Sequence, residues 1–136
     1  MSNSKIKAAI VGATGYGGAE LVRLLQNHPR AEVSCVLSSS SGGTPLSASF
    51  PHLTNIIDLE LEAIEPAVLK NKADVVFLAT PAGVSAELTP KLLEQGLKVI
   101  DLSGDLRLKD GASYEKWYKR PPAANEVLEQ AVYGLS

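Results

Sequence analysis

The sequence predicts an α/β fold in which helices flank a doubly wound, mostly parallel sheet. Short apolar runs rich in β-branched residues alternate with amphipathic stretches along the chain. The first of these runs, residues 8–11, ends in a glycine-rich turn that leads into a helical pattern. The run at residues 73–79, ADVVFLA, is apolar along almost all of its length, which is typical of a parallel strand buried on both faces.

Length and composition are those of one globular domain, residues 1–136, with 45% hydrophobic residues, 21% charged residues and a net charge of -2. This charge provides no basic surface for nucleic acid as the main partner. No apolar run approaches the roughly 18 residues of a membrane span, and residues 1–5 have no signal-peptide pattern, so we expect no membrane partner and a cytoplasmic protein. The single cysteine, Cys35, excludes a disulfide framework and a multi-cysteine metal site, and we expect no metal.

Glycines at positions 12, 15, 17 and 18 separate the first strand from a helix expected over residues 16–27. Gly12 lets the chain turn, Gly15 lets backbone approach a ligand, and Gly18 lets the helix pack closely on the strand. The spacing G-x-x-G-x-x-G differs from the commonest dinucleotide fingerprint, and position 18 lacks the lysine of a nucleoside-triphosphate loop. Because a helix start favours phosphate, we interpret the turn as the diphosphate site of a Rossmann-type fold, with a simple tight connection as the alternative.

Residues 31–37, AEVSCVL, predict the second strand, in which we interpret Cys35 as a small buried apolar residue. In this fold an acidic residue about 20 positions after the glycines binds the ribose hydroxyls of NAD. That region carries serines and glycines without a carboxylate: Ser38, Ser39, Ser40, Ser41, Gly42 and Gly43. A carboxylate would repel a 2′-phosphate, so we expect NADP as the cofactor, although no arginine is present to bind the phosphate. A flexible linker is the alternative.

The middle of the chain predicts less regular structure. Residues 44–55 carry two prolines, and His52 among them is interpreted as a surface residue. Residues 56–64 alternate apolar and acidic side chains, as a half-exposed strand near a sheet edge does. A short helix is expected over residues 67–72, directly after Pro66.

Two further strands are expected at residues 73–79 and 99–102, joined by an amphipathic helix over residues 85–95 that Pro90 delays or bends. Small residues in the turn at 80–83 leave room for a nicotinamide or ribose. Ligands in open α/β sheets bind beyond the carboxyl ends of the strands. The segments that begin at residues 12, 38, 80 and 103 are therefore expected to surround one crevice.

Polar side chains after the strand at 99–102 are candidates to bind a substrate: Asp101, Asp105 and Arg107. An ion pair between Asp105 and Arg107 explains the same spacing. Further along, Tyr114, Trp117 and Tyr118 form an aromatic cluster that we expect to pack beneath a loop. A helix over residues 126–130 and a short strand over 131–133 complete the prediction.

Taken together, the motifs resemble the N-acetyl-gamma-glutamyl-phosphate reductase family. They are GATGYGGAELVRLL at 12–25, the serines after the second strand, LATPAGVS at 78–85, VIDLSGDLRL at 99–108, YEKWY at 114–118 and AVYGL at 131–135. They occur in the family's order over nearly the whole chain. A single one of them would also suit aspartate-semialdehyde dehydrogenase, which we keep as an alternative parent enzyme.

The resemblance implies that NADPH reduces an acyl phosphate to N-acetylglutamate semialdehyde in arginine biosynthesis, through a thioester on a cysteine. It implies that the NADP diphosphate is bound by Gly12, Thr14, Gly15, Tyr16 and Gly17. It assigns the adenosine end to Ser38, Ser39, Ser40 and Ser41, and the nicotinamide side to Pro81 and Ser103. Arg107 matches the arginine expected to hold a phosphate or carboxylate of the substrate, since a guanidinium binds two oxyanion oxygens at once.

Departures from the family pattern bear on activity. The arginine that family members carry among the serines is absent. The family's catalytic cysteine and histidine lie downstream of the AVYGL motif, and Cys35, in the middle of a strand, cannot replace that cysteine. We therefore expect an NADP-binding domain without a catalytic and dimerisation domain, inactive by itself, with exposed apolar surface. The parent enzyme is expected to be a homo-oligomer.

Two other classes of protein share part of this pattern. Extended short-chain reductases and nucleotide-sugar epimerases share the glycine turn but need a Tyr-x-x-x-Lys pair, and no tyrosine here has lysine four positions later. A non-catalytic NAD(P)-sensing module stays open as an alternative. A sensor would change its association state with cofactor, whereas an enzyme fragment would be rescued by the missing half.

Overall fold

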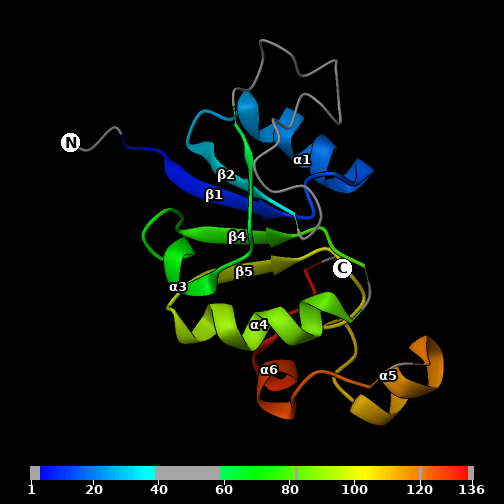
Figure 1. Cartoon of the computed structure of the whole chain (residues 1–136). Coiled ribbons are helices and arrows are strands. Elements are labelled where there is room, and N and C mark those ends of the chain that lie inside the picture. Colours follow the sequence, from blue (N-terminus) through cyan, green and yellow to red (C-terminus); the bar gives the residue numbers. More distant parts are fainter. Residues whose placement is uncertain (1–3, 39–58, 82, 120, 135–136) are drawn as a thin grey trace.

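The computed structural model describes residues 4–38, 59–81, 83–119 and 121–134 (Figure 1). Its centre is a sheet in the order β3-β2-β1-β4-β5, in which all paired strands are parallel. The strands are β1 (Ile6–Val11), β2 (Ala31–Leu37), β3 (Leu61–Glu62), β4 (Val75–Leu78) and β5 (Lys98–Asp101). The chain moves outward from β1 in both directions, which confirms the predicted doubly wound α/β fold of the Rossmann type.

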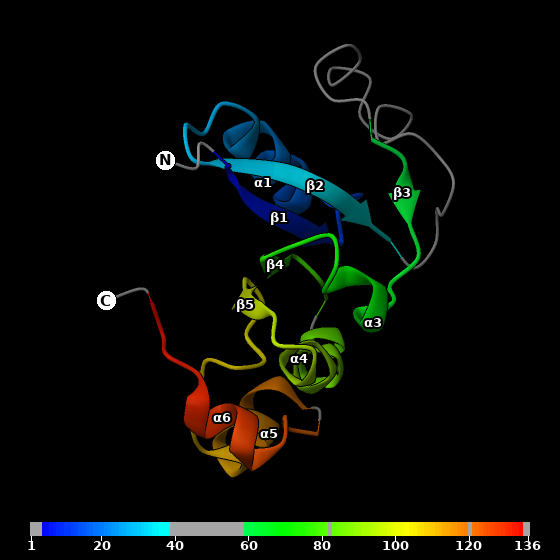
Figure 2. The same ribbon diagram turned by 90° about the vertical axis from the view of Figure 1, so that its left-hand side faces the viewer.

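Helices cover both faces of this sheet. Helix α1 (Tyr16–Gln26) lies on one face, and α3 (Pro66–Leu69) and α4 (Val84–Glu94) lie on the other (Figure 2). Helices α5 (Gly111–Tyr118) and α6 (Asn125–Gln130) lie beyond β5. No helix among the described residues is long and apolar enough to span a bilayer.

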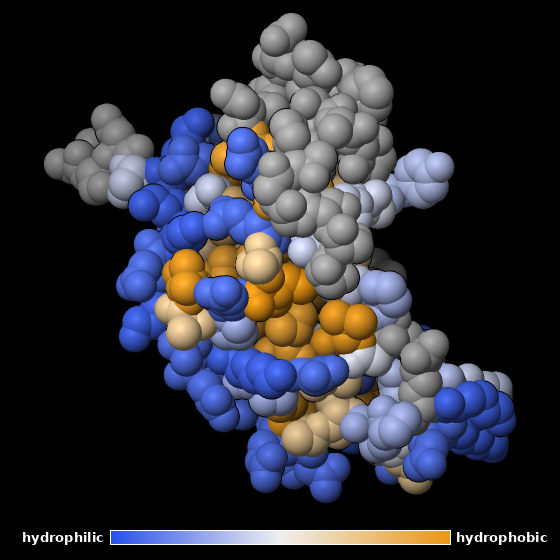
Figure 3. Space-filling model, viewed as in Figure 1, coloured by the Kyte–Doolittle hydropathy of each residue, from blue (hydrophilic) through white to orange (hydrophobic). Residues whose placement is uncertain are grey.

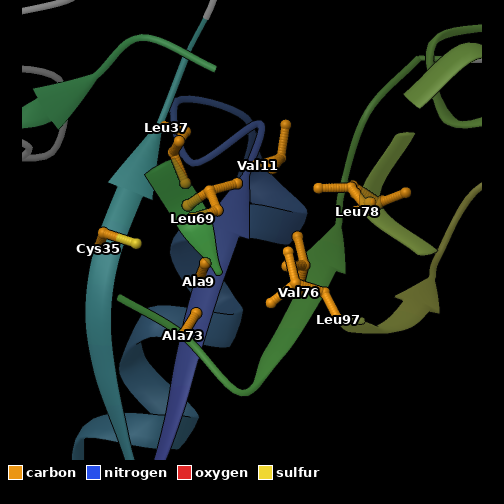
Figure 4. Packing of buried hydrophobic residues seen from close by; sticks show 10 residues of the cluster. Ala9, Val11, Cys35, Leu37, Leu69, Ala73, Val76, Leu78 and Leu97 are labelled. Atoms are coloured by element: carbon orange, nitrogen blue, oxygen red, sulfur yellow. The ribbon is translucent and has the colours of Figure 1, made fainter. Parts of the chain in front are cut away.

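Buried side chains form one cluster on each face of the sheet. The cluster on the α3–α4 face contains Ala9, Val11, Cys35, Leu37, Leu69, Ala73, Val76, Leu78, Leu92 and Leu97 (Figure 4). The cluster on the α1 face contains Ile10, Ala13, Val22, Val36 and Leu61. Successive residues of β1 alternate between the two clusters because side chains of a strand point to opposite faces.

A bulge in β2 decides where Cys35 points. The pairing of β1 with β2 shifts by one residue between Ala8 and Ala9, which leaves Ser34 unpaired. The Ser34 hydroxyl donates to the Ala8 carbonyl at 3.3 Å. Because of this extra residue, Val33 packs toward α1 whereas Cys35 packs toward α3 and α4.

Two local expectations need correction. Helix α4 begins at Val84 and runs through Pro90 to Glu94 as one helix, so the proline does not delay its start. Residues 131–133 are not a strand. The Lys109 ammonium donates to the carbonyls of Leu128, Glu129 and Ala131 and holds the end of α6 beside the loop before α5. A groove of about 920 Å³ separates the segment after α6 from β5.

Other predicted elements are confirmed in full or in part, or lie outside the described residues. Of the strand predicted at 56–64, only the edge strand β3 at Leu61–Glu62 is present, paired with β2, and residues 56–58 lie outside the described residues. Gly96, with φ +78°, ends α4 as expected. The expected aromatic packing is confirmed for Tyr114, which is fully buried and stacks on Tyr118 with centroids 4.6 Å apart, and it is wrong for Trp117, which is 70% exposed. The irregular segment at 44–55, with His52, lies outside the described residues.

Candidate cofactor site

The glycine turn after β1 is packed so closely that two of its positions exclude a side chain. Gly12 has φ +83°, and a Cβ there would lie 2.3 Å from the carbonyl oxygen of Ala79. A Cβ on Gly18 would lie 2.4 Å from the carbonyl oxygen of Gly12. The backbone at Gly12 therefore nearly touches the end of β4, and the start of α1 nearly touches the turn.

The start of α1 is open on the side that a ligand would approach. Gly15 is the N-cap, no side chain caps the helix, and its first turn holds no acidic residue. Gly15, Tyr16 and Gly17 are exposed, Tyr16 to 91%, and Thr14 is half-buried. An uncapped helix start offers N–H donors and a partial positive charge to an anion. The predicted diphosphate residues thus share one open surface at the carboxyl end of β1.

The strand order aligns the predicted segments along one edge of the sheet. Strands β2, β1, β4 and β5 are neighbours and parallel, so their carboxyl ends lie side by side. The carbonyl of Leu37 accepts from the N–H groups of Gly12 at 3.0 Å and Ala13 at 3.4 Å, which joins the end of β2 to the turn. The chain builds the sheet outward from β1 in one direction and then, from β4, in the other. Open α/β sheets bind ligands at the carboxyl ends of the two strands where this direction changes, here β1 and β4.

The serines after β2 are described in part. Ser38 is buried, and its N–H donates to the carbonyl of Glu62 at the end of β3, at 3.1 Å. Ser39, Ser40 and Ser41 lie outside the described residues.

Within the described ranges, no group of three His, Cys, Asp or Glu side chains could hold a metal ion.

Hydrogen bonds fold the loop after β5 into a fixed turn. Asp101 accepts from the N–H of Ser103 at 2.9 Å and from its hydroxyl at 3.0 Å. The same hydroxyl accepts from the N–H of Asp105 at 3.1 Å. Pro81, in the neighbouring turn after β4, is exposed, and Ser103 is half-buried. The two residues predicted on the nicotinamide side therefore belong to adjacent loops.

Asp105 does not have either of its predicted roles. Its side chain is fully buried, and its oxygens accept from the N–H groups of Gly83 and Ala86 and from the hydroxyl of Tyr114. A substrate cannot reach it, and the described residues contain no ion pair between Asp105 and Arg107. Sequence reasoning missed this role because the partners lie 22, 19 and 9 positions away.

Arg107 remains available to an anion from solvent. It is exposed, and its guanidinium donates to the hydroxyl of Tyr118 at 3.0 Å. Its guanidinium carbon lies 5.9 Å from the centre of the Tyr118 ring, within cation–π range. Arg107, Ser103 and Gly104 line the groove beside β5. The tyrosine fixes one end of a group with several donors, which leaves others for an oxyanion.

Cys35 cannot serve as a nucleophile. Its side chain has no exposed surface and packs in the cluster between the sheet and α3–α4. Burial raises the pKa of the Cys35 thiol, and the neighbouring Ser34 hydroxyl opposes this in part. The thiolate is the reactive form, so both access and ionisation are unfavourable.

We therefore expect the thiol of Cys35 to be protected in the folded chain. At pH 8 a disulfide reagent such as dithionitrobenzoate should modify it about 100-fold or more slowly than in the urea-unfolded chain, where the pKa is near 8.5. The release of thionitrobenzoate measures both rates. Equal rates would show that β2 does not bury the thiol.

Comparison with known proteins agrees with this geometry. The model of the family described as semialdehyde dehydrogenase, NAD binding domain, matches residues 7–136. N-acetyl-gamma-glutamyl-phosphate reductase of Bacillus subtilis (strain 168) is 57% identical over 132 residues, covering 96% of this chain and 38% of that protein. The protein of the same name from Bacillus cereus (strain B4264) is 56% identical over 131 residues, with the same coverage. The chain thus spans 38% of the length of these relatives.

A solved structure shares the fold. Aspartate semialdehyde dehydrogenase with NADP from Candida albicans superposes with a TM-score of 0.69 at 26% identity. The superposition covers 79% of this chain and 32% of that one.

Proposed function

We propose that this chain, which belongs to the semialdehyde dehydrogenase family through its NAD-binding domain, binds NADP(H) for an N-acetyl-gamma-glutamyl-phosphate reductase. One observation carries the cofactor part: α1 starts without a cap or an acidic residue, behind a turn whose positions 12 and 18 have no room for a side chain. The identity of 57% to the Bacillus subtilis reductase supports the activity.

The diphosphate is assigned to the surface at the start of α1. The residues are Gly12, Thr14, Gly15, Tyr16 and Gly17. Gly12 lets the chain turn tightly against the end of β4, and the exposed backbone of Gly15 and Gly17 offers N–H donors without side chains in the way. A helix start stabilises each negative charge by about 0.3–1 kcal/mol at an exposed position.

The adenosine end is assigned to the segment after β2. Ser38 stands at the carboxyl end of that strand, and Ser39, Ser40 and Ser41 follow it. Hydroxyl groups donate hydrogen bonds to a phosphate, and a segment without a carboxylate does not repel one. This composition supports NADP rather than NAD as the cofactor.

The nicotinamide side is assigned to the two loops that carry Pro81 and Ser103, and the substrate anion to Arg107. NADPH bound there supplies the hydride that reduces an acyl phosphate to an aldehyde, with inorganic phosphate as the leaving group. Arg107 neutralises and orients the phosphate or a carboxylate of the substrate. The proposal includes arginine biosynthesis, a cytoplasmic location and a homo-oligomeric parent enzyme.

A chimera tests the proposal. Residues 1–136 replace the equivalent part of the Bacillus subtilis reductase, and NADPH oxidation by N-acetyl-gamma-glutamyl phosphate is followed. We expect activity from the chimera and none from the 136-residue chain alone, because its single cysteine is buried. A chimera that folds and binds NADPH without activity would contradict the assigned enzyme. It would favour the aspartate-semialdehyde-dehydrogenase parent or the sensing module.

The groove beside β5 is the surface against which we place the rest of the parent enzyme. Exposed apolar side chains line it: Ile100, Leu102, Val132 and Tyr133. On the side of the sheet that carries α3 and α4, Figure 3 shows further hydrophobic residues gathered over β4 and β5, with hydrophilic residues around them. Exposed apolar patches of this kind mark interfaces.

We expect the 136-residue chain to bind anilinonaphthalene sulfonate in this groove. Leu102→Gln should lower the dye fluorescence because it removes an apolar lining residue that is 54% exposed. Leu24→Gln is the matched control, since Leu24 is equally exposed at 56% but lies on α1, outside the groove. A titration of each variant measures the effect. No dye binding by the unmodified chain would argue against an open apolar interface.

A further inference from the structure

The buried carboxylate of Asp105 joins the two loops that follow β4 and β5. It lies in the loop after β5, yet it accepts hydrogen bonds at the start of α4, which follows β4 (Figure 1). The Gly83 N–H donates to its two oxygens at 2.8 and 3.0 Å, and the Ala86 N–H donates at 3.0 Å. Both oxygens act as acceptors, which is the pattern of an ionised carboxylate.

The carboxylate also replaces a local helix cap. Gly83, the N-cap residue of α4, has a φ of +94° and no side chain, so it cannot accept a hydrogen bond from the first turn of the helix. A serine or aspartate at the N-cap would accept from the Ala86 N–H without burying a charge supplied by another loop, but it would leave the N–H of the N-cap residue itself without that acceptor. Burial of a charge is costly unless its hydrogen bonds are complete. The long-range arrangement therefore fixes one loop relative to the other, which a local cap cannot do.

A second set of contacts continues from Asp105 toward Arg107. The Tyr114 hydroxyl donates to Asp105 at 2.6 Å, and the Tyr114 ring stacks on Tyr118. The Tyr118 hydroxyl accepts from Arg107 and lies so close to the loop that a Cβ on Gly104 would be 2.3 Å from it. The start of α4, the loop after β5, α5 and Arg107 thus form one connected unit.

We propose that Asp105 is a positioning residue that holds the turn after β4 and the loop after β5 in the relative position needed to bind the nicotinamide half of the cofactor. This rests on the proposed function, which places the nicotinamide between Pro81 and Ser103. The proposed function assigns the adenosine half to the segment after β2, and the hydrogen bonds of Asp105 join only the start of α4, the loop after β5 and α5. Loss of the carboxylate therefore weakens the binding of the nicotinamide half alone.

Asp105→Asn tests this in the 136-residue chain with two ligands, NADPH and adenosine 2′,5′-bisphosphate, which carries only the adenosine end. The amide keeps the shape but turns one acceptor into a donor that faces an N–H or hydroxyl group. We expect the Kd of NADPH to rise about tenfold or more, as for a lost hydrogen bond to a charged group, with the Kd of the bisphosphate unchanged. A merely structural role would weaken both ligands equally.

Two further variants make the result decisive. Tyr114→Phe removes one donor to Asp105 and keeps the stacked ring, so it should weaken NADPH selectively, by a smaller factor, even if Asp105→Asn fails to fold. Asp110→Asn is the control, because Asp110 caps α5 through the Ala112 N–H and the Ser113 hydroxyl without touching the turn after β4. It should leave both affinities unchanged.

The outcomes separate the two proposals. Selective loss of NADPH affinity in Asp105→Asn or Tyr114→Phe supports the positioning role. Equal loss for both ligands, or no loss in either variant, overturns it. An unmodified chain that binds neither ligand overturns the proposed function itself.

Discussion

Gly12→Ala is expected to lower the Tm of the chain by about 10 to 20 °C and to abolish NADPH binding. The left-handed φ of +83° costs an alanine about 1–2 kcal/mol, and its Cβ would meet the Ala79 carbonyl oxygen at 2.3 Å and the carbonyl carbon at 2.9 Å. Both obstacles are backbone atoms of the β4 end, so relief requires β1 and β4 to separate. With about 1–3 kcal/mol for overpacking, the total is about 2–5 kcal/mol of unfolding free energy.

Alanine at the two glycines in the first turn of α1 provides a second test and a control. Gly18→Ala should also destabilise the chain, because its Cβ would lie 2.7 Å from the Cα of Ala13. Gly17→Ala should leave the Tm unchanged or raise it, since nothing lies within 4 Å of its Cβ and alanine favours a helix. The gain in the free energy of unfolding is at most about 1 kcal/mol. Thermal unfolding followed by circular dichroism measures all three. An unchanged Tm for Gly12→Ala would contradict the packing of the turn.

Ser38→Asp is expected to reverse the preference between the two nicotinamide cofactors. It places a carboxylate at the end of β2, where we assign the 2′-phosphate. Repulsion between like charges of about 3 kcal/mol corresponds to about a 100-fold loss of NADPH affinity. NADH has ribose hydroxyls there, which donate to a carboxylate, so its affinity should stay the same or rise.

Ser38→Asn is the matched control for charge. The asparagine has nearly the shape of aspartate and tolerates a phosphate, so NADPH should remain the preferred cofactor. Fluorescence titration of each variant with NADPH and NADH yields the ratio of the two Kd values. An equal ratio in the aspartate and asparagine variants would show that position 38 does not face the 2′-phosphate.

The parts of the fold that depend on local patterns were predictable. The glycine turn, the apolar run at 73–79 and the stop at Gly96 are each determined by backbone freedom or burial within a few residues, and each is confirmed. The bulge at Ser34 was not visible, because a strand pattern does not reveal a shift of pairing. Yet this bulge decides which face Cys35 occupies.

The parts that depend on distant residues were not predictable. Asp105 has its partners in other elements, and the sequence offered substrate binding or an ion pair with equal weight. The apolar pattern at 131–133 indicated a strand, but a strand also needs a partner at the right position, and Lys109 holds the end of α6 elsewhere. Contacts over long sequence separations decide such cases, and residue spacing does not encode them.

Calorimetric titration of the unmodified 136-residue chain with NADPH and NADH tests the central claim most directly. If the turn at 12–18 and the serines after β2 form an NADP site, NADPH binds at one site with at least about tenfold higher affinity than NADH, which corresponds to about 1.4 kcal/mol. Binding of neither cofactor would contradict the assignment of the glycine turn. Clear preference for NADH would contradict the assignment of the serines.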